Sequence, residues 1–386
     1  MRRISIFGAT GSIGESTFDL VRHREDIRTV ALTGGRNVAR LAQMARELRA
    51  EVAVTAYDEC LPELREALAG SGVDAAGGRE AIVEAADRPA DWIMSAIVGA
   101  AGLLPGLRAL RHGTTLALAN KESLVTAGPL LMATAAASGA TILPVDSEHS
   151  GIFQCLAGSS SSGIERAIIT ASGGPFREWT AERMANATLA EAVAHPSWAM
   201  GQRISIDSAS MFNKALEVIE TREFFDIEPA RIEVLVHPQS IVHAMVGFAD
   251  GGLLAHLGPA DMRHAIGFAL NWPDRRHVPV DRLDLARIGA LEFRAPDDMR
   301  FPALRLAREV MDMRGLHGAV LNAAKEIALD HFIAGRIAFP HMAVMVEKTL
   351  QQAAGDPFFG QPATRLEDIE EADARARRWA TTQAEG

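Results

Sequence analysis

The feature that most constrains this fold is a regular alternation of short apolar runs and amphipathic segments over residues 1–145. The predicted strands are Ile4–Phe7, Thr29–Leu32, Val52–Thr55, Trp92–Ile97, Thr115–Leu118 and Thr141–Val145. Between them lie segments with helical spacing, such as Val38–Leu48. Strands that alternate with helices form right-handed crossovers and a parallel sheet covered on both faces. We therefore predict an α/β fold that starts with a Rossmann-like domain over residues 1–145, with ligands at the carboxyl ends of its strands.

The pattern changes after residue 145. Further strands are predicted at Ala167–Thr170, Arg203–Ile206, Ile232–Val236, Ile241–Val246 and Leu253–His256, with fewer helices between them. This order predicts a central α+β domain over residues 146–272. Within it, residues 172–202 are irregular in pattern, and a segment this long is typical of a functional, mobile lid or of a disordered loop.

Three prolines, Pro273, Pro279 and Pro296, mark a predicted linker over residues 273–298. Four segments with helical spacing follow it: Ala303–Met313, Val320–Ala334, Met342–Ala353 and Leu366–Ala380. Four consecutive helices predict a C-terminal helical bundle over residues 299–386.

Composition excludes several classes of partner. The chain carries 39 basic and 49 acidic side chains, a formal net charge of −10, which disfavours nucleic acid and anionic membranes. The uncharged stretch Ser123–Val145 is interpreted as a helix to about Ser138 followed by a strand, because Gly and Pro interrupt it.

Cys60 and Cys155 lie far apart, so no disulfide framework is expected. With a strand predicted at the very start, we expect no signal peptide and a cytoplasmic location.

A glycine-rich turn follows the first predicted strand. Residues 8–14 read G-x-x-G-x-x-G and open a helix, which is typical of a dinucleotide site, although tight strand–helix turns share this composition. No acid follows the second strand, where an NAD-selective protein usually carries one. Instead Arg36 can pair with a 2′-phosphate and Asn37 can donate to it, so NADPH is the expected cofactor. The alternative interpretation of this segment is a solvated turn in which Asn37 is a helix N-cap.

Acidic residues gather in two places. Asp146 and Glu148 are two apart, so in extended chain they point to the same side and could share Mg²⁺ or Mn²⁺. Further on, Asp207 or Ser208 is the expected N-cap of a helix over Met211–Phe224. That helix presents Asn213, Lys214 and Glu217 on one face. A solvated turn and a surface ion pair are the alternative interpretations. Four histidines are further polar candidates, although each is more commonly structural: His149, His195, His237 and His243.

Taken together, these segments resemble the 1-deoxy-D-xylulose 5-phosphate reductoisomerases of the non-mevalonate isoprenoid pathway. The matching text is GATGSIGEST at 8–17, GGRN at 34–37, ALANKESLV at 117–125, LPVDSEHSGIFQCL at 143–156, TASGGPFRE at 170–178, HPSWAMG at 195–201, ISIDSASMFNKALEVIE at 204–220, VHPQSIVHAMV at 236–246 and LNAAKEIA at 321–328. These segments cover nearly the whole chain in the family's order.

The resemblance implies a metal-dependent rearrangement of 1-deoxy-D-xylulose 5-phosphate, followed by NADPH reduction to 2-C-methyl-D-erythritol 4-phosphate. It implies one divalent cation, Mg²⁺, Mn²⁺ or Co²⁺, and a homodimer. The implied metal ligands are Asp146, Glu148 and Glu217. The implied catalytic and substrate-binding residues are Lys121, Ser147, Glu148, Ser172, His195, Trp198, Ser208, Asn213, Lys214 and Glu217. The implied NADPH contacts are Thr10, Gly11, Ser12, Ile13, Gly35, Arg36, Asn37, Asn120, Glu122 and Gly201. A retro-aldol/aldol route and a direct 1,2-shift are both compatible with these residues.

The chain departs from the family pattern at a few positions. Ala260 stands where the family commonly has Pro near the nicotinamide, and Lys325 replaces a usual Asn in the C-terminal region. Two other functions remain open on the residues alone. One is another NADPH-linked oxidoreductase with structural acids, which would need no metal. The other is an NADPH-sensing protein without turnover.

Overall fold

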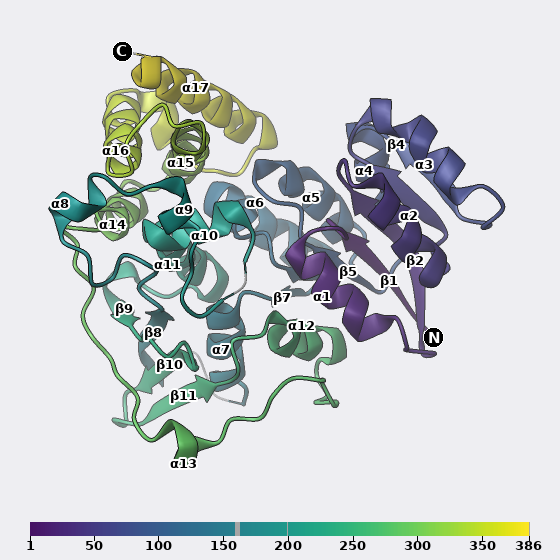
Figure 1. Cartoon of the computed structure of the whole chain (residues 1–386), viewed down its shortest axis with the longest axis horizontal. Coiled ribbons are helices and arrows are strands. Elements are labelled where there is room, and N and C mark those ends of the chain that lie inside the picture. Colours follow the sequence, from purple (N-terminus) through teal and green to yellow (C-terminus); the bar gives the residue numbers. More distant parts are fainter. Residues whose placement is uncertain (159–162, 199, 386) are drawn as a thin grey trace. The chain divides into compact units, whose positions relative to one another are not determined.

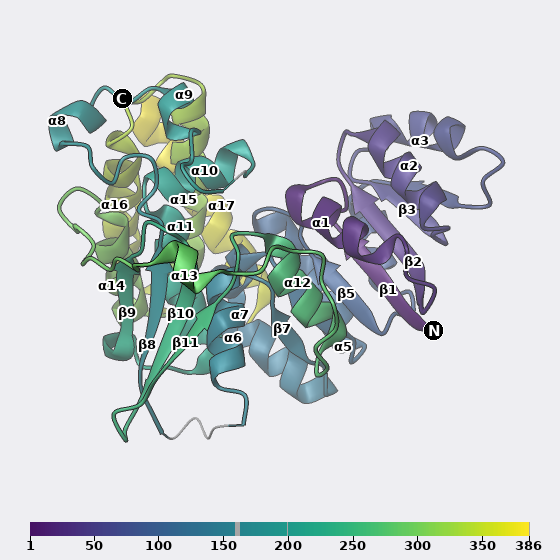
Figure 2. The same cartoon turned by 60° about the horizontal axis from the view of Figure 1, so that its bottom comes forward.

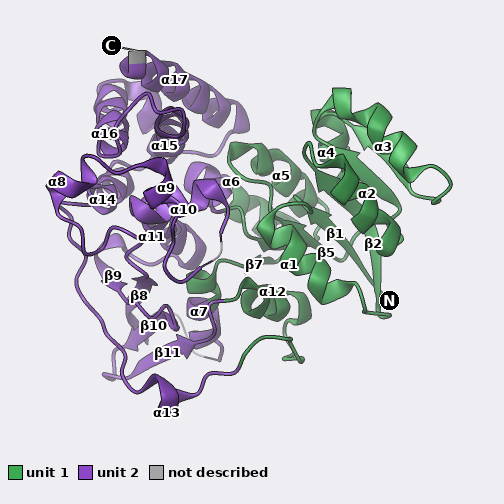
Figure 3. Ribbon diagram, in the orientation of Figure 1, with its two compact units in different colours: residues 1–120, 131–150, 261–281 green, residues 121–130, 151–260, 282–386 purple. Residues whose placement is uncertain are grey.

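The computed structural model describes residues 1–158, 163–198 and 200–385 and forms two compact units (Figures 1 and 3). Unit 1 consists of residues 1–120, 131–150 and 261–281, and unit 2 of residues 121–130, 151–260 and 282–386. The sequence-domain boundaries given above are a different division and stay a prediction.

Unit 1 contains the predicted parallel sheet. Its strands run in the order β4-β3-β2-β1-β5-β6-β7, all parallel. The strands are β1 (Arg2–Phe7), β2 (Ile27–Gly34), β3 (Val52–Thr55), β4 (Asp74–Gly77), β5 (Trp92–Ser95), β6 (Thr115–Leu118) and β7 (Ile142–Pro144). The order reverses between β1 and β5, which is where open α/β sheets bind ligands at the carboxyl ends of their strands.

One strand of this sheet was not predicted. β4 reads Asp-Ala-Ala-Gly and pairs only with β3 at the edge of the sheet. The segment has no β-branched or large apolar side chain, so its sequence carries no strand signal. The pairing with β3, rather than local propensity, makes it a strand.

The helices of unit 1 follow the predicted alternation. They are α1 (Ser12–Val21), α2 (Val38–Glu47), α3 (Leu61–Leu68), α4 (Arg79–Ala85), α5 (Leu103–Arg111) and α12 (Met262–Asn271), with short 3₁₀ turns η1 (Asp58–Cys60) and η2 (Ala100–Gly102). α12 comes from much later in the chain. The Trp92 indole N–H donates to the Ala269 carbonyl over 3.2 Å, which ties α12 to the sheet.

Unit 2 is built on a mixed sheet with the order β11-β10-β8-β9, seen side by side in Figure 2. Its strands are β8 (Ile164–Ala171), β9 (Ile232–Val236), β10 (Val242–Phe248) and β11 (Leu253–Leu257). β8 pairs with β9 in parallel and with β10 antiparallel. This mixed pairing agrees with the predicted α+β character.

The strand predicted at Arg203–Ile206 is wrong, because these residues lie in the helix α10 (Gln202–Ala209). The alternation Arg-Ile-Ser-Ile is typical of a strand. α10 nevertheless buries Ser205, Ile206 and Ala209, a spacing that fits one helical face. Tertiary packing therefore outweighs the local alternation.

Helices make up the rest of unit 2. They are α8 (Ala181–Met184), α9 (Leu189–Ala192), α10, α11 (Phe212–Phe225), α13 (Leu285–Ile288), α14 (Ala303–Met313), α15 (His317–Ile333), α16 (His341–Ala354) and α17 (Leu366–Glu385), with η4 (Pro229–Arg231) and η5 (Pro357–Gly360). The predicted four C-terminal helices are confirmed as α14–α17, which pack on one another. In the predicted lid, α8 and α9 are short and are capped by Thr180 and Thr188.

Two helices cross from one unit to the other: α6 (Lys121–Ser138) and α7 (Ser147–Cys155). α6 is kinked at Ala127, just before Pro129. No helix among the described residues has both the length and the apolar character that a bilayer span requires.

Candidate active site

The glycine-rich turn joins β1 to α1. Gly8 has φ +84°, and a Cβ there would stand 2.4 Å from the Ala96 carbonyl oxygen, so only glycine fits. A Cβ on Gly14 would stand 2.2 Å from the Ala9 carbonyl oxygen, so the turn packs tightly on its own helix. Gly11 is the N-cap of α1, and no described side chain caps that helix. The turn thus presents backbone N–H groups of Ser12 and Ile13 at a helix N-terminus, which suits a pyrophosphate.

The end of β2 carries the predicted 2′-phosphate site. Arg36 is exposed and pairs with Glu59 at 2.9 Å between Nη2 and Oε1. The Asn37 side chain accepts a hydrogen bond from the Arg40 backbone N–H over 3.2 Å and so caps α2. Asn37 is therefore the N-cap of α2, and the exposed Arg36 guanidinium at the end of β2 is positioned to meet a ligand anion.

A buried cluster of charges lies within unit 2, between α6 and α11. The Lys121 ammonium donates to Glu217 Oε1 over 2.7 Å and to Asn213 Oδ1 over 2.8 Å. The Lys214 ammonium donates to Glu217 Oε2, and Asn213 Nδ2 donates to Oε1. The side chains of Lys121, Lys214 and Glu217 are 8%, 4% and 1% exposed. The shared helical face of Asn213, Lys214 and Glu217 is confirmed, and the alternative of a surface ion pair is excluded by the burial.

The first acidic pair lies at the start of α7. Glu148 is in the first turn of that helix, so the predicted extended conformation of this segment is wrong. The Glu148 backbone N–H donates to Asp146 Oδ1 over 3.4 Å, and Ser147 Oγ donates to Glu148 Oε2 over 2.7 Å. The two carboxyl groups face the same way because a helix N-terminus turns the chain back on itself, not because the chain is extended.

The three predicted metal ligands come together. One carboxylate oxygen from each of Asp146, Glu148 and Glu217 lies within 4.8 Å of the others. Oxygen ligands lie about 2.1 Å from Mg²⁺, so ligands of one ion are about 3 to 4 Å apart. The donor set is all oxygen and carries three formal negative charges, which fits a hard divalent cation.

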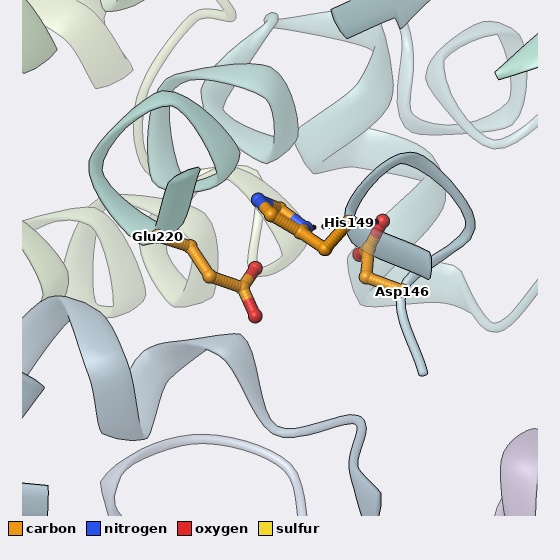
Figure 4. Close-up of side chains that lie close together, drawn as sticks. All are labelled: Asp146, His149 and Glu220. Atoms are coloured by element: carbon orange, nitrogen blue, oxygen red, sulfur yellow. Dashed lines mark ion pairs between the residues drawn. The ribbon is translucent and has the colours of Figure 1, made fainter. Parts of the chain in front are cut away.

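A second group shares one of these acids. Asp146, His149 and Glu220 also offer ligand atoms within 4.8 Å of one another, and Figure 4 shows the three side chains close together. His149 Nδ1 lies 3.8 Å from Asp146 Oδ1, and the His149 side chain is fully buried. Glu220 was not predicted. Its position three residues after Glu217, on the same face of α11, is the sequence feature that could have indicated it.

His195 is held by three hydrogen bonds within unit 2. The backbone N–H groups of Ser197 and Trp198 donate to its Nδ1, over 3.2 and 2.9 Å. Because Nδ1 accepts, the ring proton lies on Nε2, which donates to Ser172 Oγ over 2.9 Å. Burial, with a contribution from the charge of Arg177, lowers the pKa of His195 to about 4. A neutral imidazole is therefore built to position the Ser172 hydroxyl.

The remaining predicted substrate residues lie on or beside α10. Ser208 belongs to α10, and its carbonyl lies against Gly174 of the Ser172 loop, since a Cβ on Gly174 would stand 2.8 Å from it. Gly201 is the N-cap of α10. The prediction that Asp207 or Ser208 caps α11 is wrong, because Met211 takes that position with φ +63°. The Trp198 ring lies 6.2 Å from the His243 ring, centroid to centroid.

Asn120 and Glu122 flank the start of α6. The Asn120 side chain donates to the carbonyls of Ile97 and Gly99, over 2.5 and 2.9 Å. It therefore holds the loop after β5 in place. Glu122 is in the first turn of α6, where a carboxylate is favoured by the helix dipole.

Comparisons with known proteins decide the family. The sequence model of 1-deoxy-D-xylulose 5-phosphate reductoisomerase matches residues 4–128, and models of its C-terminal domains match residues 142–225 and 257–379. A 1-deoxy-D-xylulose 5-phosphate reductoisomerase of Cereibacter sphaeroides is 71% identical over 387 residues, covering 100% of this chain and 98% of the relative. The chain belongs to the 1-deoxy-D-xylulose 5-phosphate reductoisomerase family.

Other members of the reductoisomerase family are similarly close. The protein of Paracoccus denitrificans is 64% identical over 381 residues, with 98% of each chain covered. The solved structure of the Zymomonas mobilis reductoisomerase in complex with NADPH has a TM-score of 0.93 at 47% identity, covering 100% of this chain and 99% of that one. A reductoisomerase structure in complex with NADPH, fosmidomycin and magnesium has a TM-score of 0.94 at 41% identity, covering 100% and 98%. The predicted family and fold class are confirmed.

One position at which the chain departs from the reductoisomerase pattern has a clear structural partner. The Lys325 ammonium on α15 donates to Asp207 Oδ2 on α10 over 3.0 Å, and the two side chains are 3% and 8% exposed. Burial opposes the charge of Lys325, but Asp207, Glu122 and Glu326 outweigh it and raise the pKa of the ammonium. The pair ties α10, which carries Ser208, to the C-terminal helices.

Proposed function

We propose that this chain rearranges 1-deoxy-D-xylulose 5-phosphate and reduces the product with NADPH to 2-C-methyl-D-erythritol 4-phosphate, a step in isoprenoid precursor synthesis. The observation that carries the proposal is the grouping of Asp146, Glu148 and Glu217 within 4.8 Å, with two buried lysines on Glu217. Membership of the reductoisomerase family supports it. An oxidoreductase with merely structural acids has no need of such a grouping.

Two cofactors are proposed. Asp146, Glu148 and Glu217 would hold one divalent cation, Mg²⁺, Mn²⁺ or Co²⁺, since their donor set is all carboxylate. NADPH would bind through Thr10, Gly11, Ser12, Ile13, Gly35, Arg36, Asn37, Asn120, Glu122 and Gly201. When bound, the cation polarises the carbonyl and hydroxyl oxygens of the sugar, and NADPH supplies the hydride.

The chain's own polar groups supply binding and orientation. Ser172, Ser208, Asn213 and Lys214 are proposed to hold the substrate phosphate, with His195 orienting the Ser172 hydroxyl. A phosphate held this way contributes binding energy remote from the reacting carbons, which can orient them. Lys121 and Ser147 are proposed to contact the sugar oxygens. Trp198 is proposed to cover the sugar and exclude water from it.

The proposed working form is a homodimer in the cytoplasm. Cys60 and Cys155 are both free thiols, which is consistent with a reducing compartment. Sedimentation of the purified chain would report its mass in solution. A monomer at micromolar concentration would reject the dimer without affecting the proposed reaction.

The proposed reaction is tested by following NADPH absorbance with 1-deoxy-D-xylulose 5-phosphate, with and without EDTA. We expect absorbance loss that EDTA abolishes and that added Mg²⁺ or Mn²⁺ restores. Trp198→Ala is expected to lower turnover and raise the KM for the sugar, whereas Trp179→Phe is the matched aromatic control. No absorbance loss at saturating metal and substrate would reject the function, and unchanged kinetics of Trp198→Ala would reject the role of Trp198.

A further inference from the structure

Tyr57 is the only tyrosine of the chain, and its ring stacks against the Arg36 guanidinium. The Arg36 guanidinium carbon is 3.8 Å from the centroid of the Tyr57 ring, a close cation–π contact. Tyr57 is 39% exposed, so the ring is presented at the surface rather than used as core. The ring contacts Arg36, the side chain proposed to bind the 2′-phosphate of NADPH. Because the ring is exposed, core packing does not explain its position.

The backbone around this contact is held by the end of β3. Thr55 Oγ1 donates to the Gly35 carbonyl over 3.0 Å, and the Ala56 N–H donates to the Gly34 carbonyl over 2.8 Å. The turn that carries Arg36 and the segment that carries Tyr57 are therefore fastened together. Ring and guanidinium meet because two neighbouring parallel strands end at the same edge of the sheet.

Glu59 contacts the edge of the guanidinium that the ring leaves open. Arg36 Nη2 lies 2.9 Å from Glu59 Oε1, and the two side chains are 62% and 61% exposed. An ion pair this exposed contributes little to stability and exchanges partners easily. A phosphate accepts the same N–H groups with two oxygens and a larger charge, so it competes favourably with a carboxylate.

We propose that Tyr57 and Glu59 set the dinucleotide specificity of this chain. Tyr57 is a positioning residue that holds the Arg36 guanidinium flat and ready for the 2′-phosphate of NADPH. Glu59 occupies the guanidinium edge until that phosphate displaces it. The inference rests on the proposed use of NADPH. It gives Tyr57 and Glu59 a role in cofactor selection in addition to the glycine-rich turn and Arg36.

The physical reason is preorganisation. An exposed arginine side chain otherwise samples many rotamers, and fixing it costs affinity when a ligand binds. Stacking on Tyr57 removes part of that cost before the cofactor arrives. Glu59 acts in the opposite sense, because its carboxylate competes with the 2′-phosphate for the same N–H groups and repels it. NADH has no 2′-phosphate, so neither residue affects its binding.

The test is direct binding of NADPH and of NADH by calorimetry, without substrate or turnover. Tyr57→Leu is expected to raise the Kd for NADPH about fivefold and to leave that for NADH unchanged. Tyr57→Phe, which keeps the ring, is expected to bind like the wild type. Glu59→Gln is expected to lower the Kd for NADPH about twofold to fivefold. Glu66→Gln, the same charge change at an exposed position of α3, is the control for long-range charge effects and should change neither Kd.

A double-variant cycle separates positioning from direct contact with the nucleotide. In an Arg36→Ala background, Tyr57→Leu is expected to have no further effect on NADPH binding. Equal weakening of NADPH and NADH by Tyr57→Leu, or an effect that persists without Arg36, would overturn the inference and show that the ring contacts the nucleotide itself. A wild-type chain that binds neither dinucleotide overturns both the inference and the proposed cofactor. If the wild-type chain prefers NADPH and all these variants keep the same preference, the inference is overturned and the proposed cofactor is not.

Discussion

The cofactor turn of unit 1 and the charge cluster of unit 2 use ion pairs in opposite ways. Arg36 and Glu59 are both more than half exposed, whereas Lys214 and Glu217 are 4% and 1% exposed. Exposed pairs are worth little and exchange partners with a ligand at low cost. Buried pairs are costly to break, because removing one partner leaves an uncompensated charge in a poorly polarisable environment. The first region is therefore suited to adjustable recognition and the second to a fixed arrangement of charges.

The same contrast extends to the two anchors of α10. Lys325 and Asp207 form a buried pair, while Arg203 on the same helix forms an exposed pair with Asp330 on α15. α10 has eight residues and a glycine N-cap, so it has little stability of its own. The buried pair fastens the end of α10 that carries Ser208 to α15. If burial controls how much an ion pair contributes, substitutions at buried pairs should cost more activity or stability than those at exposed pairs.

The largest effect is expected for Glu217→Gln. The change removes one proposed metal ligand and leaves the ammonium groups of Lys121 and Lys214 without their carboxylate. We expect kcat/KM for 1-deoxy-D-xylulose 5-phosphate to fall about a thousandfold, the loss of several kcal/mol of transition-state stabilisation. Steady-state kinetics with Mn²⁺ titration measures it, and Glu233→Gln, at a half-exposed site on β9, is the control. Activity within tenfold of the wild type would contradict the proposed ligand.

Lys325→Met is expected to destabilise the fold by about 3 to 5 kcal/mol, since it leaves Asp207 buried and unpaired. Urea unfolding measures the loss. The double variant with Asp207→Asn should recover part of it, because the buried charge is then removed. A loss below about 1 kcal/mol, equal to that of a surface pair, would contradict the contrast between buried and exposed charges.

Arg36→Ala is expected to raise the KM for NADPH about tenfold to thirtyfold and that for NADH less than about twofold, because only NADPH carries the 2′-phosphate. The ratio of the two KM values is the measurement. Equal changes for both cofactors would remove Arg36 from the proposed 2′-phosphate site.

A smaller effect is expected from the protonation of His195. Its pKa, about 4 in the folded chain, lies below the unfolded value of about 6.5. Both states are neutral above the unfolded pKa, so the free energy of unfolding is unaffected there. As the pH falls from 6.5 towards 4 the unfolded chain takes up the proton first, and stability is lost.

His195→Gln should remove this loss, which we put at about 1 kcal/mol after allowing for partial exposure. Urea unfolding of both proteins between pH 7 and pH 4 measures the difference. An identical pH dependence would show that burial and the charge of Arg177 do not hold His195 neutral in the folded chain.

The smallest effect is expected for Arg166→Gln. Arg166 pairs with Glu233 across β8 and β9 at 3.2 Å, and both side chains are close to half exposed. We expect less than about 0.5 kcal/mol of change in the free energy of unfolding and no change in kinetics. A loss above about 2 kcal/mol would mean that exposure does not control the worth of an ion pair in this chain.

Much of the candidate site was predictable because it depends on short-range patterns. The parallel sheet follows from apolar runs that alternate with helical segments, and β3 and β6 have their predicted bounds. The shared face of Asn213, Lys214 and Glu217 follows from helical periodicity alone. In each case a few neighbouring residues carry the whole signal, so no knowledge of distant contacts is needed.

Tertiary structure decided the rest. Residues 203–206 alternate like a strand but form part of α10, and Glu148 lies in a helix rather than an extended segment. The partner of Lys325 is 118 positions away in sequence, and no local pattern points to it. Pairings of this kind depend on burial, since the same two charges at the surface would be worth little and would leave no constraint on the fold.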